Sequence, residues 1–335
     1  MVELLSGTQF HSLASLYPAY RNEFVEQVKA HREYVKKFFN VDAKVFANTG
    51  YIYNDAVGKS VEEMGFEGLL TEGVGRVLGE RPPNYVYCSR GANGLKILFR
   101  HHRLTDDISI RFFQRNWSEY PLTAEKYANW LSSTGGDVIT IALNIETLRE
   151  DQPSFKGILE FLKHLPIETA RRGNLEWATP LEALRGCPAS AVILIPETET
   201  ISWAGEKKDT AFWLSNAMQR ISFDRMASLK PYVNEVNDNG ITKIWRLLQQ
   251  SDHIEYMVME KEELGGDHLS YNPYSSPAEA YAVFDSIFTD FEGKVATIVQ
   301  RMRRAKVQPP PTRTTLQPTR PPVSPSLSYS RHSGY

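Results

Sequence analysis

The chain has 335 residues, of which 41% are hydrophobic and 23% are charged, and its 38 basic and 40 acidic residues leave a net charge of -2. This composition is typical of a water-soluble globular protein with enough core for one large domain or two smaller ones. The charge balance gives no reason to expect a nucleic acid or an anionic membrane as partner.

The first hundred residues alternate between helical and strand patterns. Apolar residues at helical spacing predict an amphipathic helix over residues 20–39, with Asn40 as its stop. The segment "AKVFAN" reads as a strand, "YIYNDAVGKSVEEMG" as a helix that ends at Gly65, and "FEGLLTEG" as a buried strand. The β-like runs "NYVYCSR", "LKILFR" and "ISIRFF" follow.

The next hundred residues continue the alternation. Thr123 is the expected cap of a helix in "TAEKYANWLSS", and "DVITIALNI" reads as a strand. Then come a helix in "SFKGILEFLKHL", a strand in "GNLEWATP", a helix in "PLEALRG" and the apolar run "AVILIPE", whose type the pattern leaves open. Residues 1–201 therefore predict an α/β fold with a mostly parallel sheet, and the number of units allows a barrel.

The pattern changes after residue 201. Residues 202–306 contain long helical patterns and few strand signals, which predicts a helical subdomain. Residues 308–335 contain seven prolines, three arginines and no acid, so we expect a disordered tail from residue 307 onward. Such a tail is either a solvated extension or a polyproline II ligand for an SH3-type domain.

The cysteines and the N-terminal sequence indicate in which cellular compartment the protein is expected. Cys88 and Cys187 are far apart and outside any metal-ligand spacing, so neither a disulfide framework nor a metal site is expected. The N-terminus lacks the features of a signal peptide, and no run approaches the ~18 apolar residues of a membrane span. These features favour a cytoplasmic protein.

Polar groups follow two of the predicted strands. Glu72 ends "GLLTE", and Asn144 and Glu146 follow "ITIAL" two residues apart, which places both on one face of a strand. Two acids at strand ends are typical of glycoside hydrolysis, in which one carboxyl group attacks the sugar and another protonates the leaving oxygen. The same acids could instead cap helices or face water.

Aromatic and hydrogen-bonding residues supply candidates for sugar contacts. Sugar faces stack on aromatic rings, although such rings fill protein cores as well, and a histidine is equally compatible with a structural role. The candidates are His11, Trp117, Tyr120, Trp245, Asp252 and His253.

Blocks in the same order along about residues 1–260 resemble glycoside hydrolase family 57, in particular its α-amylase and amylase-like branch. The resemblance implies an incomplete (β/α)7 barrel followed by helices, and retaining hydrolysis or transfer on α-1,4-glucans without a metal or other cofactor. The blocks are "FHSLASL", "VFANTGYIYNDAVGKSVEEMGFEGLLTEG", "PPNYVYCSRG", "LTDDISIRF", "WSEYPLTAEKYANWL", "LPIETARRGNLEWATP", "ISWAGEKKDTAFWLSNAMQR" and "WRLLQQSDHIEYM".

The resemblance also assigns roles. Glu72 in "LLTEG" matches the nucleophile, whereas Asn144 stands where the family has the general acid/base aspartate of an Asp-x-Glu motif, with Glu146 as its support. An amide has no proton to transfer in the working pH range, so this exchange should cost about 10² to 10⁴ in rate, or roughly 3 to 5 kcal/mol. The chain also departs from the branch at Gly7, Ala47, Gly50, Leu148, Arg149 and Asp151.

The family pattern begins with a strand that carries a His-Gln-Pro-type motif, which this chain lacks. We therefore expect a barrel without its first strand, whose open edges would favour a homo-oligomer or a complementing N-terminal fragment. Three functions remain open: a retaining α-glucan hydrolase with weak or no turnover, a non-catalytic protein that binds α-glucan or maltooligosaccharide, and a structural α/β protein that uses its tail to engage a partner.

Overall fold

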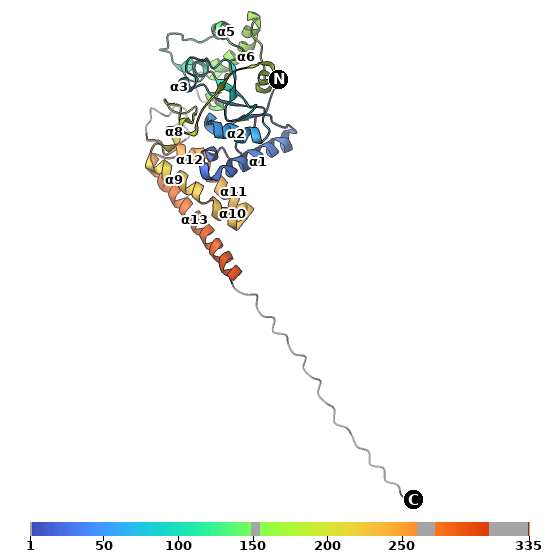
Figure 1. Cartoon of the computed structure of the whole chain (residues 1–335). Coiled ribbons are helices and arrows are strands. Elements are labelled where there is room, and N and C mark those ends of the chain that lie inside the picture. The colour runs from blue at the N-terminus through green and yellow to red at the C-terminus, as the bar shows by residue number, and fades with distance from the viewer. Residues whose placement is uncertain (1, 149–154, 260–271, 308–333, 335) are drawn as a thin grey trace.

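The computed structural model describes residues 2–148, 155–259, 272–307 and 334. An α/β body contains a five-stranded mixed sheet with the order β1-β2-β4-β3-β5, and helices surround it (Figure 1). The predicted tail at residues 308–333 and the departures from the family pattern at Arg149 and Asp151 concern residues outside the described part of the chain. The strands are β1 (Val45–Ala47), β2 (Gly68–Glu72), β3 (Val86–Ser89), β4 (Lys96–Arg100) and β5 (Ala189–Ile193).

Helices lie before, between and after the strands. The first set is α1 (Arg21–Phe39), α2 (Asp55–Glu63), α3 (Gly75–Leu78), α4 (His102–Ser109), α5 (Ala124–Ser133), α6 (Phe155–Arg172) and α7 (Pro180–Gly186). The second set is α8 (Ala211–Leu214), α9 (Ala217–Ser228), α10 (Lys230–Val236), α11 (Asn239–Leu247), α12 (Ser251–Glu255) and α13 (Pro277–Val307). The 3₁₀ turns η3 (Thr49–Tyr51) and η5 (Ile145–Leu148) flank the region discussed below.

Local end signals formed as the sequence predicts. Asn40 adopts the left-handed conformation that ends α1, with its N–H bonded to the Lys36 carbonyl. Thr123 caps α5 by accepting a hydrogen bond from the N–H of Lys126. Each of these helix ends depends on a hydrogen bond between residues three or four apart in the sequence. Such signals can therefore be predicted without knowledge of contacts between distant residues.

The sheet is mostly parallel, as the sequence predicts, and it includes one antiparallel pair. Strands β1, β2 and β4 pair in parallel, and β5 runs parallel to β3. Strand β3 runs antiparallel to β4, with Val86 opposite Leu98. A short turn joins β3 to β4, and strands connected so closely pair as an antiparallel hairpin.

The strand expected over Asp137–Ile145 is reduced to one parallel bridge between Thr140 and Arg100. Strand β3 occupies the neighbouring position along Lys96–Leu98, so only the end of β4 is available to this segment. Ile139, Ile141 and Leu143 nevertheless pack together against α5 and α6. Their alternation predicted a full strand, of which only the bridge at Thr140 formed.

Two other strand predictions were wrong. The run "ISIRFF" lies in the end of α4 and a 3₁₀ turn, because Leu104 and Ile108 bury one helical face. The segment "GNLEWATP" forms no strand, and its Trp177 is exposed. The run "AVILIPE", whose type the sequence left open, begins inside β5, which starts two residues earlier at Ala189 and ends at Ile193.

The largest apolar cluster joins the sheet to the later helices. It contains Phe46 and Ile97 from the strands together with Trp245 and Phe288 from α11 and α13. Helix α13 packs along α9 and α10 and extends away from the sheet (Figure 1). A division of the chain at residue 201 stays a prediction. Within the described part of the chain, no helix is both long and apolar enough to cross a membrane.

Candidate active site at the strand ends

Glu72 is the last residue of β2, which pairs with β1 on one side and β4 on the other. All five residues of this strand are buried. The register places Glu72 opposite Arg100, the last residue of β4. The carboxyl ends of these parallel strands therefore bring an acidic and a basic side chain together at one edge of the sheet.

Arg100 connects three parts of the chain through its guanidinium group. Its Nη1 lies 3.0 Å from Oε2 of Glu72, and its Nη2 donates to Oδ1 of Asp106 at 2.8 Å. Its Nε donates to the Ala142 carbonyl at 3.1 Å. Arg100 thus joins β2 and α4 to the segment that leads to Asn144.

The carboxyl group of Glu72 lies in a strongly perturbed environment. Burial raises the pKa of Glu72, and Asp106 acts in the same direction, whereas Arg100 and Lys208 oppose the rise. The side chain is 0% exposed, and its Oε1 has no hydrogen-bond partner among the described residues. A sugar could reach this carboxylate only if the covering residues moved.

Asn144 lies two residues beyond the carbonyl that Arg100 holds, and it is exposed. Its amide cannot serve as a proton donor. Glu146 lies in η5, so the alternation of a strand does not describe its relation to Asn144. The expectation that both residues share one strand face was therefore wrong.

Of the positions where the chain departs from the family pattern, Gly50 is sterically closed and Gly7 is tightly packed. Gly50 has a φ of 59°, and a Cβ at this residue would lie 2.3 Å from the ring of Trp213. A Cβ at Gly7 would lie 3.1 Å from the Ala47 carbonyl. The Trp213 indole thus occupies the space that a larger residue at position 50 would need.

Three of the sugar-contact candidates lie in the helical region and have structural contacts. Trp245 is fully buried, and its indole N–H donates to the Met226 carbonyl at 3.0 Å. The His253 ring packs 5.4 Å from that of Phe284, and Asp252 lies in the first turn of α12. The buried location of Trp245 does not fit a sugar-stacking role, because neither ring face is accessible.

Two of the other three candidates, His11 and Tyr120, are exposed. His11 is exposed, and its Nδ1 lies 3.1 Å from the Ser251 hydroxyl. Trp117 is half-buried with its ring centroid 6.0 Å from that of Trp130. Tyr120 is 41% exposed, which leaves its ring available for stacking on a sugar.

Sequence reasoning missed several residues at this edge. A pocket of about 300 Å³ begins at Gly73, directly after Glu72, and reaches His102 and Lys208. Tyr51 is close enough for Arg100 and Glu72 to influence its pKa, which burial raises. An arginine at the end of "LKILFR" was the one available signal, because two parallel strands place their last residues together. Among the described residues, no group of three or more His, Cys, Asp or Glu side chains could hold a metal ion.

Comparisons with known proteins were made on sequence and on structure. The model for "Glycosyl hydrolase family 57" matches residues 1–196. A Methanocaldococcus jannaschii protein provisionally named an alpha-amylase is 40% identical over 299 residues, which are 87% of this chain. The chain spans 63% of that relative's length.

Solved structures with similar folds share far less sequence. A family 57 type branching enzyme from Pyrococcus horikoshii has a TM-score of 0.60 at 13% identity, covering 76% of this chain and 60% of its own. The α-amylase AmyC from Thermotoga maritima has a TM-score of 0.58 at 11% identity, covering 90% of this chain and 70% of its own. At this identity the likeness shows the fold alone.

Proposed function

Because the chain belongs to glycosyl hydrolase family 57, we propose that it is an amylase-like protein that acts on α-1,4-glucans through Glu72, with low turnover. The observation that supports this proposal most is the pairing of Glu72 with Arg100, which also binds the segment leading to Asn144. Retaining hydrolysis needs a nucleophile and a general acid close to each other. The two contacts of Arg100 bring Glu72 and the segment before Asn144 to one edge of the sheet.

The proposed chemistry is retaining. The Glu72 carboxylate attacks the anomeric carbon, the glycosidic bond breaks, and a glycosyl ester forms. Arg100 favours the ionised form of Glu72, which the attack requires. Asn144 cannot protonate the leaving oxygen, so an ordinary glucan reacts slowly while an activated donor reacts without this help.

The second step is slow for the same reason. Water must lose a proton as it attacks the ester, and Asn144 cannot accept that proton. The glycosyl ester on Glu72 should therefore persist after reaction with an activated donor. We propose Glu146 as the support of the acid position, the role that the family resemblance implies.

A second candidate function is glucan binding without cleavage. The complete burial of Glu72 and the amide at position 144 both favour it. Tyr120 would then be the main stacking residue, because its ring is exposed.

For both functions we propose the same fold assignment. The five strands correspond to part of the family's incomplete (β/α)7 barrel, and residues 202–306 form the helical subdomain that follows it.

Covalent trapping tests the proposal. Full-length protein is incubated with an activated α-maltosyl donor such as α-maltosyl fluoride, digested with a protease and analysed by mass spectrometry. We expect a maltosyl adduct on the peptide that contains Glu72, and no such adduct in Glu72→Gln. An adduct at another residue, or fluoride release that persists in Glu72→Gln, would reject Glu72 as nucleophile. Donor binding with no reaction would favour the non-catalytic function.

A further inference from the structure

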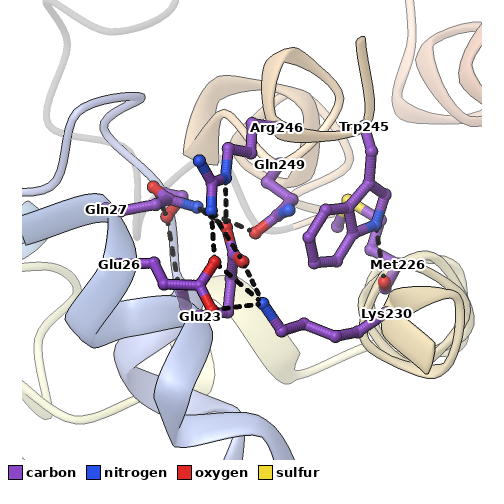
Figure 2. A network of polar contacts seen from close by, with 10 residues as sticks. Glu23, Glu26, Gln27, Met226, Lys230, Trp245, Arg246 and Gln249 are labelled. Atoms are coloured by element: carbon purple, nitrogen blue, oxygen red, sulfur yellow. Dashed lines mark hydrogen bonds and ion pairs between the residues drawn. The ribbon is translucent and has the colours of Figure 1, made fainter. Parts of the chain in front are cut away.

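A charge cluster around the buried Glu23 and Lys230 joins α1 to α10 and α11 (Figure 2). Glu23 is 0% exposed, and its carboxylate accepts from Nζ of Lys230 at 2.5 Å and from Nε of Arg246 at 2.7 Å. Glu26 contacts the same two cations from the next turn of α1. Because burying ions costs most of what their attraction returns, such a cluster is weak evidence for a stabilising role alone.

Gln27 extends this cluster into the loop that precedes α1. Its Nε2 donates to Glu23 at 2.9 Å and to Gln249 at 3.1 Å, while its Oε1 accepts from the Ser12 hydroxyl at 2.8 Å. Figure 2 shows Gln27 at one side of the cluster, with its amide directed toward Glu23 and Gln249. Every polar atom of the amide therefore has a partner, which determines its orientation.

The contacts continue from Ser12 toward the sheet. The N–H of Ser12 donates to Oγ1 of Thr8 at 3.1 Å, and Oγ1 of Thr8 lies 2.9 Å from Oγ1 of Thr49. Ser12, Thr8 and Thr49 are all buried. A continuous chain of buried polar contacts thus runs from the cations of α10 and α11 to the first residue of η3.

The turn η3 is under backbone strain beside the candidate nucleophile. Gly50 and Tyr51 both have left-handed φ values, 59° and 50°, and this region is costly for tyrosine. The Tyr51 carbonyl accepts from the Thr71 hydroxyl at 2.7 Å, and Thr71 directly precedes Glu72. Such a conformation persists only where the surrounding contacts hold it, and Thr8 is one of the residues that hold this turn.

We propose that Gln27 is a positioning residue for Glu72, acting through Ser12 and Thr8 on the turn formed by Thr49, Gly50 and Tyr51. The inference rests on the proposed role of Glu72. In this proposal the charge cluster has a function. It fixes the orientation of Gln27 from α10 and α11, and Gln27 in turn holds the turn beside the strand ends.

The test compares Gln27→Met with Gln219→Met. Both glutamines are fully buried, and Gln219 on α9 donates to the carbonyls of Phe212 and Ile254. Both variants lose buried hydrogen bonds, but the hydrogen-bonded path through Ser12, Thr8 and Thr49 includes Gln27 and not Gln219. Thr8→Val interrupts the same path without touching the charge cluster, and it decides the question if Gln27→Met does not fold.

The readout is the titration of the Glu72 carboxyl carbon by ¹³C NMR in full-length protein, assigned with Glu72→Gln. The charged and titratable groups that influence this carboxyl group are Arg100, Lys208, Asp106 and Tyr51. A loosened turn would admit water, so we expect Gln27→Met and Thr8→Val to lower the midpoint by about half a pH unit. Gln219→Met should leave it unchanged.

The inference is overturned if folded Gln27→Met and Thr8→Val titrate like the wild type, or if Gln219→Met shifts the midpoint equally. The first result would make the path a purely structural feature, and the second would indicate general loosening. Because this readout needs no turnover, it can succeed even if covalent trapping rejects the proposed function. Conversely, a Glu72 adduct together with an unchanged midpoint would reject only the positioning role.

Discussion

Glu72 and Arg100 are register partners on adjacent parallel strands, and their side chains form a buried ion pair with 3.0 Å between Oε2 and Nη1. This pair places the candidate nucleophile at the carboxyl edge of the sheet, and Arg100 partly offsets the burial that raises the pKa of Glu72. Through a separate hydrogen bond, from its Nε to the Ala142 carbonyl, Arg100 also connects β4 to the segment before Asn144.

Removal of the Arg100 guanidinium should destabilise the protein strongly. Arg100→Met leaves Glu72 buried without its counter-charge, a loss that typically costs about 3 to 5 kcal/mol. Urea unfolding at pH 7 measures it. The matched control is Arg303→Met, which removes an exposed ion pair with Glu235 and should have little effect. Equal losses in the two variants would contradict the importance of the buried pair.

The stability contributed by Glu72 should fall as the pH rises. Its folded-state pKa is raised above the usual 4.5, so the folded state binds the proton more tightly than the unfolded state does. Relative to Glu72→Gln, the wild type should lose unfolding free energy from the unfolded pKa up through the folded pKa. Urea titrations between pH 4 and 8 measure this difference. A relative gain with rising pH would show that Arg100 outweighs burial.

Local signals in the sequence were sufficient for part of this account. Asn40 and Thr123 mark helix ends, and an apolar run ending in Thr-Glu places Glu72 at a strand end. Each of these features depends on a few adjacent residues, and the family pattern then attached a role to Glu72 and Asn144.

The remainder depends on contacts between distant residues. Nothing near Lys230 or Glu23 in the sequence indicates that they meet, because 207 positions separate them. The segment before Asn144 alternates like a strand, yet β3 takes the place beside β4 that it would need. The sequence suggests Trp245 as a sugar contact, but the packing of α9 against α11 buries its ring.

The charge cluster between α1 and α10 should be sensitive to the loss of one ion. Lys230→Met leaves the fully buried Glu23 with Arg246 as its remaining cation, and we expect a loss on the order of 3 kcal/mol in unfolding free energy. Chemical denaturation at neutral pH measures this loss. Lys294→Met is the control, because Lys294 pairs with Asp290 on the exposed face of α13. The cluster has no special role if both variants unfold at the same denaturant concentration.

Tyr120 should contribute to glucan affinity if its ring stacks on a sugar. Tyr120→Ala removes an exposed aromatic face, and a loss of about 1 kcal/mol would weaken maltooligosaccharide binding roughly fivefold. Isothermal titration calorimetry with maltoheptaose measures this affinity. Tyr232→Ala, which removes a similarly exposed ring from α10, should bind as the wild type does. An unchanged affinity in Tyr120→Ala would remove Tyr120 from the proposed binding surface.

The most direct test of the central claim is the rate of starch hydrolysis by Asn144→Asp relative to the wild type. Restoring the carboxyl group should raise this rate by about 10² to 10⁴, and Glu72→Gln in the same background should abolish the gain. Asn129→Asp, an exposed amide-to-acid change on α5, is the control and should leave the rate unchanged. A wild type that already hydrolyses starch as fast as Asn144→Asp would contradict the claim that position 144 limits turnover.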